Sequence, residues 1–397
     1  MAFFKKNPSY IQCGALFDIG SGSVGVAIVV SNDFENTFEI VWSHREYMLI
    51  KDDQTEADLV KEMSTTIVNA SLELGSMGLK TLHQAHPELS IQHLQTAMSA
   101  PWSYTITKTV NFENDEPFSI TLELLEELLT AAKQQPDTSK NTQIMGDSFD
   151  LQVILDAIVD IQINVYSVQK AIGTESKSIA LSYVTALANR KLISTLEGSK
   201  EKILPKAHLQ HYSFMFLYYQ VLKHLHPDTS EICLVDITNE ASEIGIVRDN
   251  ILQHTSHIPF GLFTIAREIA SECDIPKEEA YTILKNESLI NAHYSQVQKD
   301  KIQKAITHYE DELANLFMDT GDRLSIPKTI FLHTSQNTES FFSTMLERGA
   351  SKATKSEHAI HLFTSELLGK TVIDDTALAL SAHYFNNQEN YSNFVLK

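Results

Sequence analysis

One pattern occurs twice in this chain and constrains its fold more than any other feature. An apolar strand ends in an aspartate, a short polar turn follows, and a second apolar strand begins. The first copy reads ALFDIGSGSVGVAIVV, with Asp18 at the strand end, and the second reads ICLVDITNEASEIGIVRDN, with Asp236. A third strand and then a helix are expected after each copy. Such an internal duplication predicts two similar α/β lobes.

The turn of the first copy is rich in glycine and serine, because residues 18–23 read DIGSGS. Glycine weakens the interior of a strand, but it is useful where the backbone turns sharply or approaches another group closely. The turn is therefore either a plain hairpin or a backbone cradle. The second copy of the same plan favours the cradle, although its own turn contains no glycine.

Between the two copies lies a block that does not repeat. Its predicted elements are strands at 89–113 with a turn at Ala100 and Pro101, a helix at 119–135, and strands at 150–168 and 176–189. About a hundred residues in this order are enough for a small α+β subdomain. The predicted domains are 1–88 for the first part of the first lobe, 89–187 for the inserted subdomain, and 188–397 for the rest of the first lobe and the second lobe.

Charge and composition exclude several classes of function. The 397 residues include 31 Lys plus Arg against 51 Asp plus Glu, which gives a formal net charge of −20. No basic stripe is present, so no nucleic-acid partner is expected, and an anionic membrane would repel the chain. The three cysteines are far apart and the 16 histidines show no metal-binding spacing. Because no run of about 18 apolar residues occurs, we expect a cytoplasmic protein.

With both copies of the repeat in view, the chain resembles the actin-like ATPase superfamily. DIGSGSVGVAIV is similar to the first phosphate motif of that superfamily, LVDITNEASEIGIV to the second, and TIFLHTSQNTESFFSTML stands where the adenosine motif is found. The resemblance implies an α/β, two-lobed actin-like (ribonuclease H-like) duplicated fold with a small inserted α+β subdomain. It also implies that ATP and magnesium bind between the lobes, with Asp18 and Asp236 holding magnesium through water.

The same resemblance implies a set of nucleotide-binding residues. Amides of the glycines and serines in the first turn would surround the phosphates, because side chains there would block the approach of the backbone. The set consists of Asp18, Gly20, Ser21, Gly22, Ser23, Asp236, Thr238, Lys285, Thr334 and Ser335. No residue is assigned to catalysis, and at most a slow ATPase is expected.

The chain departs from the superfamily motifs at specific positions. The glycine-rich second turn has become residues 237–241 (ITNEA), in which Glu240 would repel a triphosphate unless a cation intervenes. Residues 333–335 (HTS) replace paired glycines of the adenosine motif, and Lys285 comes one place later than the usual lysine. Gly25 stands where actin has a lysine.

Within the superfamily, the chain is most similar to the branch of the cell-division protein FtsA and the type IV pilus protein PilM, through residues 163–189 and 254–285. The FtsA-like interpretation is favoured, through residues 168–173 (VQKAIG) and the later helix. It implies an ATP-regulated scaffold in cell division that self-assembles and recruits a division filament protein at the inner membrane. A PilM-like protein would be a pilus assembly platform that binds a short peptide of an inner-membrane partner. A pseudo-ATPase interaction platform without nucleotide is the third alternative. Residues 381–397 lack a basic amphipathic face, so any membrane contact is expected through a partner.

Overall fold

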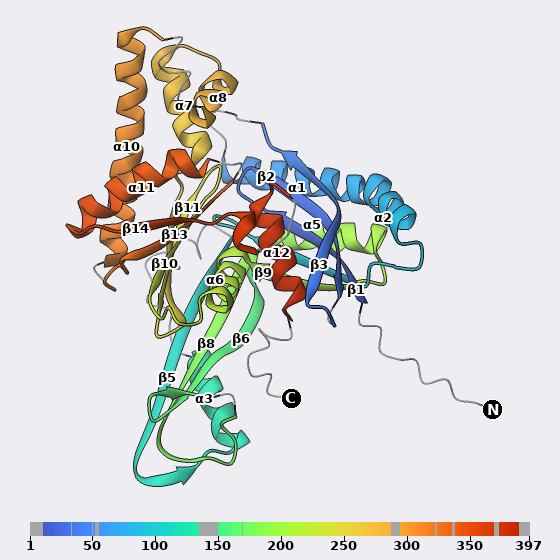
Figure 1. Ribbon diagram of the computed structural model, residues 1–397, viewed down its shortest axis with the longest axis vertical. Coiled ribbons are helices and arrows are strands. Elements are labelled where there is room, and N and C mark those ends of the chain that lie inside the picture. The colour runs from blue at the N-terminus through green and yellow to red at the C-terminus, as the bar shows by residue number, and fades with distance from the viewer. Residues whose placement is uncertain are drawn as a thin grey trace.

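Two five-stranded sheets of the same topology form the body of the protein in the computed structural model (Figure 1). The structure describes residues 11–32, 34–49, 51, 55–134, 150–168, 170–286, 294–321, 324–335, 338–368 and 373–388. Each sheet begins with an antiparallel meander of three strands. A later strand pairs in parallel with the first strand of the meander, and a fifth strand pairs in parallel with that later strand. The predicted duplication and the two-lobed α/β class are therefore confirmed.

The first sheet has the strand order β3-β2-β1-β4-β9. Its strands are β1 (Ile11–Ile19), β2 (Ser23–Asn32), β3 (Thr37–Tyr47), β4 (His93–Met98) and β9 (His208–Ser213). Its helices are α1 (Glu56–Glu73), the π-helix η1 (Leu74–Gly78), α2 (Leu79–Ala85), α5 (Arg190–Ile203) and α12 (Thr376–Asn386). Because side chains alternate between the faces of a strand, Phe17 of β1 packs with Met63 of α1, whereas Leu16 packs with Leu378 of α12.

The second sheet has the strand order β12-β11-β10-β13-β14. Its strands are β10 (Ile232–Ile237), β11 (Ser242–Arg248), β12 (Ile251–Ile258), β13 (Thr329–Thr334) and β14 (Ala359–Leu362). Its helices are α7 (Leu262–Cys273), α8 (Lys277–Lys285), α10 (Gln296–Gly321), α11 (Glu339–Thr354) and the 3-10 turn η2 (Ser365–Leu368). Val235 of β10 belongs to the core formed with α7, α10 and α11, whereas Leu234 faces the opposite side.

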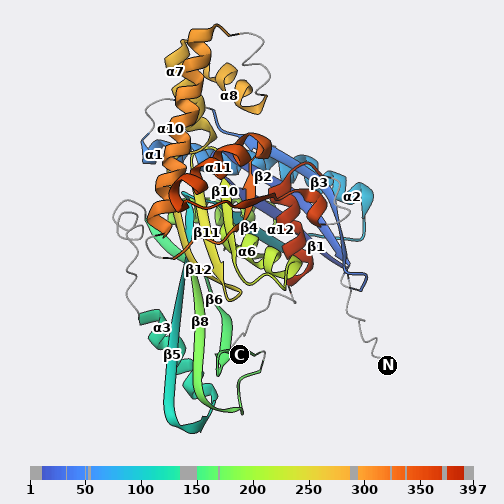
Figure 2. The ribbon, with the colours of Figure 1, turned by 60° about the vertical axis from the view of Figure 1, so that its left-hand side comes forward.

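Helix α6 (Phe214–Leu225) lies between the two sheets (Figure 2). Its residues from Phe214 to Leu222 are all buried, because the helix is apolar around nearly its whole circumference. Its core cluster takes in Leu234 of the second sheet, Ala97 of the first sheet and Leu380 of α12. Helices α6 and α12 therefore share one core cluster with strands of both lobes.

The inserted segment forms an arm that projects away from both lobes (Figure 1). Its four-stranded sheet has the order β5-β8-β6-β7. Its elements are β5 (Ser103–Ser119), α3 (Leu122–Gln134), β6 (Leu151–Ile163), β7 (Tyr166–Ser167) and β8 (Glu175–Asn189). The domain limit predicted at residue 89 differs from the strand pairing, because β4 pairs with β1 and β9 in the first sheet. The arm begins only after the turn that follows β4.

None of the described helices is both long and apolar enough to cross a membrane. Cys13, Cys233 and Cys273 are buried free thiols. Of the tail that was considered as a membrane tether, residues 381–386 are the end of α12, and residues 389–397 lie outside the described residues.

Candidate functional site

A cavity of about 250 Å³ lies where the carboxyl ends of the central strands of both lobes face each other. Asp18 and Gly20 reach it from the first sheet, and His333 reaches it from the second. The predicted site residues that line it are Asp18, Gly20, Ser23, Thr238, Lys285, Thr334 and Ser335. Ser21, Gly22 and Asp236 are not among the lining residues. The structure therefore brings most of the predicted set together.

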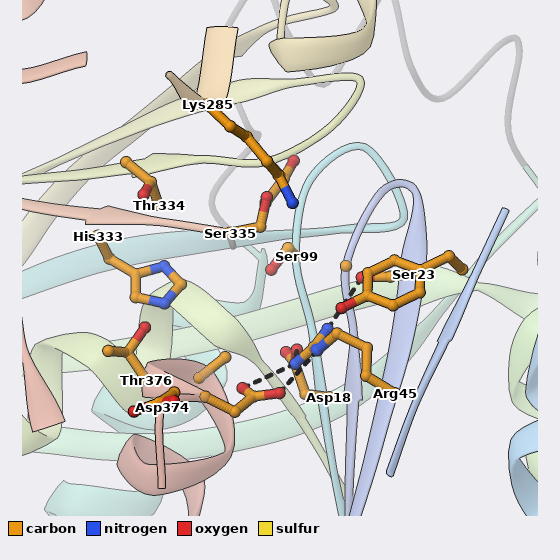
Figure 3. A pocket seen from close by; sticks show the side chains of 15 residues that line it. Asp18, Ser23, Arg45, Ser99, Lys285, His333, Thr334, Ser335, Asp374 and Thr376 are labelled. Carbon is orange, nitrogen blue, oxygen red and sulfur yellow. Dashed lines mark hydrogen bonds and ion pairs between the residues drawn. The ribbon is translucent and has the colours of Figure 1, made fainter. Parts of the chain in front are cut away.

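Arg45 of β3 lies at the wall of this cavity and binds two carboxylates at once (Figure 3). Its Nη2 donates to Asp18 Oδ2 at 2.7 Å and to Asp375 Oδ1 at 2.9 Å, while its Nε donates to Asp375 Oδ2 at 2.7 Å. Its Nη1 donates to Ser23 Oγ at 2.9 Å. Because the Arg45 side chain is only 13% exposed, both ion pairs are largely shielded from water.

Asp375 connects this cluster to α12. Its side chain is the N-cap of that helix and accepts a hydrogen bond from the backbone amide of Leu378 at 3.1 Å. Burial opposes ionisation of Asp375, but Arg45 and the Leu378 amide outweigh burial and lower the pKa of its carboxyl. At Asp18 the balance is reversed, because burial outweighs the attraction of Arg45 and raises the pKa. Arg45 therefore joins the end of β1 to the first turn of α12.

The second repeated aspartate, Asp236, pairs with a histidine instead of facing the cavity. His333 Nδ1 lies 2.8 Å from Asp236 Oδ1, and the two side chains are 3% and 1% exposed. Burial lowers the pKa of His333, but the hydrogen bond and the charge of Asp236 outweigh burial, so the pKa is raised. Glu243, which is opposite Asp236 on β11, is also buried, and burial together with the Asp236 charge raises its pKa well above the usual range. Protein groups thus enclose the second carboxylate.

The two turns predicted to hold phosphates contact each other directly. Ser21 Oγ lies 2.7 Å from Thr238 Oγ1 and accepts a hydrogen bond from the Glu240 amide at 2.6 Å. A Cβ built on Gly22 would lie only 2.5 Å from Asn239 Cβ. Such a close approach leaves no room for any residue other than glycine. In this arrangement the turn of the second lobe, and not a ligand, lies against Gly22.

Helix α7 holds the second turn in place. The carbonyl oxygens of Thr238 and Asn239 accept hydrogen bonds, at 3.1 and 2.7 Å, from the first two amides of the helix. The Glu240 carboxylate is bound by both terminal nitrogens of Arg267, at 2.8 and 2.7 Å. The charge that would repel a triphosphate is therefore paired with a cation of its own lobe.

The three remaining predicted residues lie across the cavity from Arg45 (Figure 3). Lys285 Nζ lies 4.7 Å from the centre of the Tyr281 ring, and burial lowers the pKa of the Lys285 amino group. Ser335 Oγ donates to Asn239 Oδ1 at 3.1 Å, and Thr334 Oγ1 accepts from a neighbouring threonine hydroxyl at 3.2 Å. The hydroxyl groups of Thr334 and Ser335 are therefore already used within the second lobe.

Magnesium-ATP does not fit these residues as they are arranged. The Asp18 carboxylate holds a guanidinium group, Asp236 lies behind His333, and Asn239 covers Gly22. The cavity of about 250 Å³ is also smaller than the roughly 300–1,000 Å³ that is usual for small-molecule sites. Among the described residues, no group of three or more His, Cys, Asp and Glu side chains is placed to hold a metal ion.

Sequence reasoning missed four charged residues of this site: Arg45, Glu243, Arg267 and Asp375. Glu243 lies within the second copy of the repeat, but nothing in the pattern marks it as a site residue. The other three lie outside both copies, and Asp375 precedes a helix that the duplication does not predict. One signal for Arg45 was present in the sequence. Gly25 stands where actin has a lysine, and Gly25 is directly opposite Arg45 in the pairing of β2 with β3.

No protein-family model matches this chain, and a search of curated proteins by sequence also gives no match. Solved structures give matches over nearly the whole chain. A chain of the PilM-PilN type IV pilus biogenesis complex has a TM-score of 0.53 at 13% identity, with 96% of this chain and 99% of that chain covered. The ethanolamine utilization protein EutJ from Carboxydothermus hydrogenoformans has a TM-score of 0.44 at 12% identity, with 96% and 92% covered. The fold is therefore that of the actin-like ATPases, as the resemblance implied.

Proposed function

We propose that this chain is a protein-interaction platform with an actin-like fold, of the PilM kind, that acts without bound magnesium-ATP. In this role it would bind a cytoplasmic segment of an inner-membrane protein in type IV pilus assembly. It would reach the membrane only through that partner. The alternative is an FtsA-like scaffold in cell division, which ATP would regulate.

The observation that carries the proposal is the contact between the two turns. Ser21 hydrogen bonds to both Thr238 and the Glu240 amide, and Asn239 lies against Gly22. A nucleotide phosphate bound as in the superfamily would have to displace this contact. Displacement would leave the buried Ser21 hydroxyl without its partners, and an unpaired buried polar group costs about 1–3 kcal/mol.

Two further observations support a platform role. The match to the PilM chain extends over 96% of this chain, and that chain belongs to the PilM-PilN type IV pilus biogenesis complex. The core that α6 and α12 share with both sheets also gives the lobes a packed connection that needs no ligand. One feature favours the FtsA-like alternative: the first turn keeps Gly20 and Ser23 at the cavity wall.

Calorimetric titration with ATP and magnesium tests the proposal. We expect no heat of binding and no change in melting temperature at millimolar ATP. A dissociation constant in the micromolar range would overturn the nucleotide-free role and favour ATP-regulated assembly.

The partner is tested with a peptide that carries the cytoplasmic segment of a PilN-like inner-membrane protein. We expect its dissociation constant to be the same with and without ATP and magnesium, and the same for Asp18→Ala as for the unaltered chain. Absence of binding to this peptide would refute the pilus role and leave the nucleotide result unaffected.

A further inference from the structure

The Arg45 guanidinium lies among oxygen atoms of the kind that a divalent cation prefers. It contacts carboxylate oxygens of Asp18 and Asp375 and the hydroxyl of Ser23, all between 2.7 and 2.9 Å. Oxygen ligands of this type, two carboxylates and a neutral oxygen, are those that magnesium and calcium take in proteins. An arginine in this position supplies positive charge without any bound ion.

The carboxylates need this charge because they are buried close together. Asp18 is 3% exposed, and the side chain of Asp375 is 22% exposed. Two carboxylates that share one cation repel each other when the cation is removed, and burial adds a desolvation cost. We propose that Arg45 is a built-in replacement for the divalent cation, which holds Asp18 and the N-terminus of α12 together in the absence of metal and nucleotide. This inference rests on the proposed nucleotide-free function and adds the means by which the site is stabilised.

The neighbouring strand leaves space for the guanidinium. A Cβ built on Gly25 of β2 would lie 2.5 Å from Arg45 Nη2 and 2.9 Å from Arg45 Cζ. It would also lie 3.2 Å from Leu378 of α12. The ends of the guanidinium group cannot move away easily, because both carboxylates fix them. A small residue at position 25 and an arginine at position 45 are therefore parts of one arrangement.

Removal of the positive charge gives the first test. In Arg45→Gln the two carboxylates lose their cation, and we expect the melting temperature to fall by roughly 4–6 °C. The freed oxygen ligands should then respond to metal, so that millimolar magnesium or calcium restores a measurable part of the loss. The unaltered chain should melt at the same temperature with EDTA and with either ion. The control is Arg190→Gln, because the Arg190–Asp150 pair has the same chemistry at 2.9 Å but is 52% and 72% exposed, so its loss should move the melting temperature by about 1 °C or less.

Two milder variants keep the inference testable if Arg45→Gln does not fold. Arg45→Lys retains the charge but not the planar group, so it should melt between Arg45→Gln and the unaltered chain and should not respond to metal. Gly25→Ala should displace the guanidinium and lower the melting temperature. Its control is Gly198→Ala, because a Cβ at Gly198 would meet nothing within 4 Å.

The results separate this inference from the proposed function. A melting temperature for Arg45→Gln equal to that of Arg190→Gln would overturn the role of Arg45. Equal melting of Arg45→Lys and Arg45→Gln, or destabilised variants that gain nothing from magnesium or calcium, would overturn it too. Binding of magnesium-ATP to the unaltered chain would instead refute the proposed function, whatever the variants do.

Discussion

Substitution of Gly22 by alanine would force the two turns apart. The added Cβ would lie 2.5 Å from Asn239 Cβ and 2.8 Å from Asn239 Cγ. Asn239 Cβ is bonded to the backbone and cannot rotate away, so one of the two turns must move. Movement would also stretch the hydrogen bond that the Glu240 amide donates to Ser21 Oγ at 2.6 Å and the one between Ser21 Oγ and Thr238 Oγ1 at 2.7 Å.

The size of the destabilisation in Gly22→Ala follows from the cost of forcing an extra carbon into a packed contact, which is typically about 1–3 kcal/mol. Because the blocking atom is fixed, we expect the upper part of that range, about 2–3 kcal/mol, in the free energy of unfolding. Gly20→Ala provides the matched control in the same turn. A Cβ there would meet its nearest atom, Ser23 O, at 3.4 Å, so its cost should stay within about 1 kcal/mol.

The assay is urea denaturation of four chains: the unaltered protein, Gly22→Ala, Asn239→Gly and the double variant. Asn239→Gly alone should cost about 1.5–2 kcal/mol, through the lost hydrogen bond to Ser335 and the added backbone freedom. In the double variant the clash with Asn239 is absent and only the contact with the Phe263 ring at 2.9 Å remains, so the two costs should fall short of additivity by about 1–2 kcal/mol. Equal costs for Gly20→Ala and Gly22→Ala, or full additivity in the double variant, would refute the contact as the reason for the glycine.

Two further measurements test the backbone and the buried histidines. Val165 is 81% exposed at a φ of 68° in the turn between β6 and β7, so Val165→Gly should stabilise the chain by about 0.5–1 kcal/mol in urea denaturation. Val153→Gly, at the third residue of β6, should instead destabilise it. A loss of stability in Val165→Gly would contradict this. Burial lowers the pKa of His211, His257 and His383 from 6.5 to about 4, with a like-charged neighbour adding to the effect at the last. Between pH 6.5 and 4 the unfolded chain therefore binds more protons than the folded chain. The contribution of these three histidines to the free energy of unfolding is complete above pH 6.5 and should be lost as the pH falls towards 4. Melting temperatures that do not fall over that range would show that these residues are accessible in the folded state.

The sequence predicted the duplicated lobes because the information is local and repeated. The apolar strands at Asp18 and Asp236 are buried on both faces, so their composition shows the burial directly. The limit of the arm was less accurate, because β4 and β5 are both strand-like and only the pairing of β4 with β1 assigns it to the first sheet. Strand pairing between distant segments has no signal in one sequence.

The candidate site was predicted only in part, because its positive charge comes from positions outside the repeat. Arg45 lies in an ordinary alternating strand, and its two carboxylate partners are 27 and 330 residues away in the chain. Another group comes close at Gly22, where Asn239 lies, but not at Gly20, where an added Cβ would meet its nearest atom only at 3.4 Å. Which group it is depends on the contact between lobes, and that contact brings together Ser21 and Thr238, 217 residues apart.

The base of the arm rests on both lobes. Trp102 Nε1 donates to Gly20 O at 2.9 Å in the first lobe, and Thr255 Oγ1 of the second lobe donates to Thr105 O at 2.7 Å. The chain at the base of the arm is thus anchored to both lobes, while the far end of the arm reaches out from the body of the protein. Any displacement of this base would have to strain or break hydrogen bonds in both lobes, one of them at the carbonyl oxygen of Gly20.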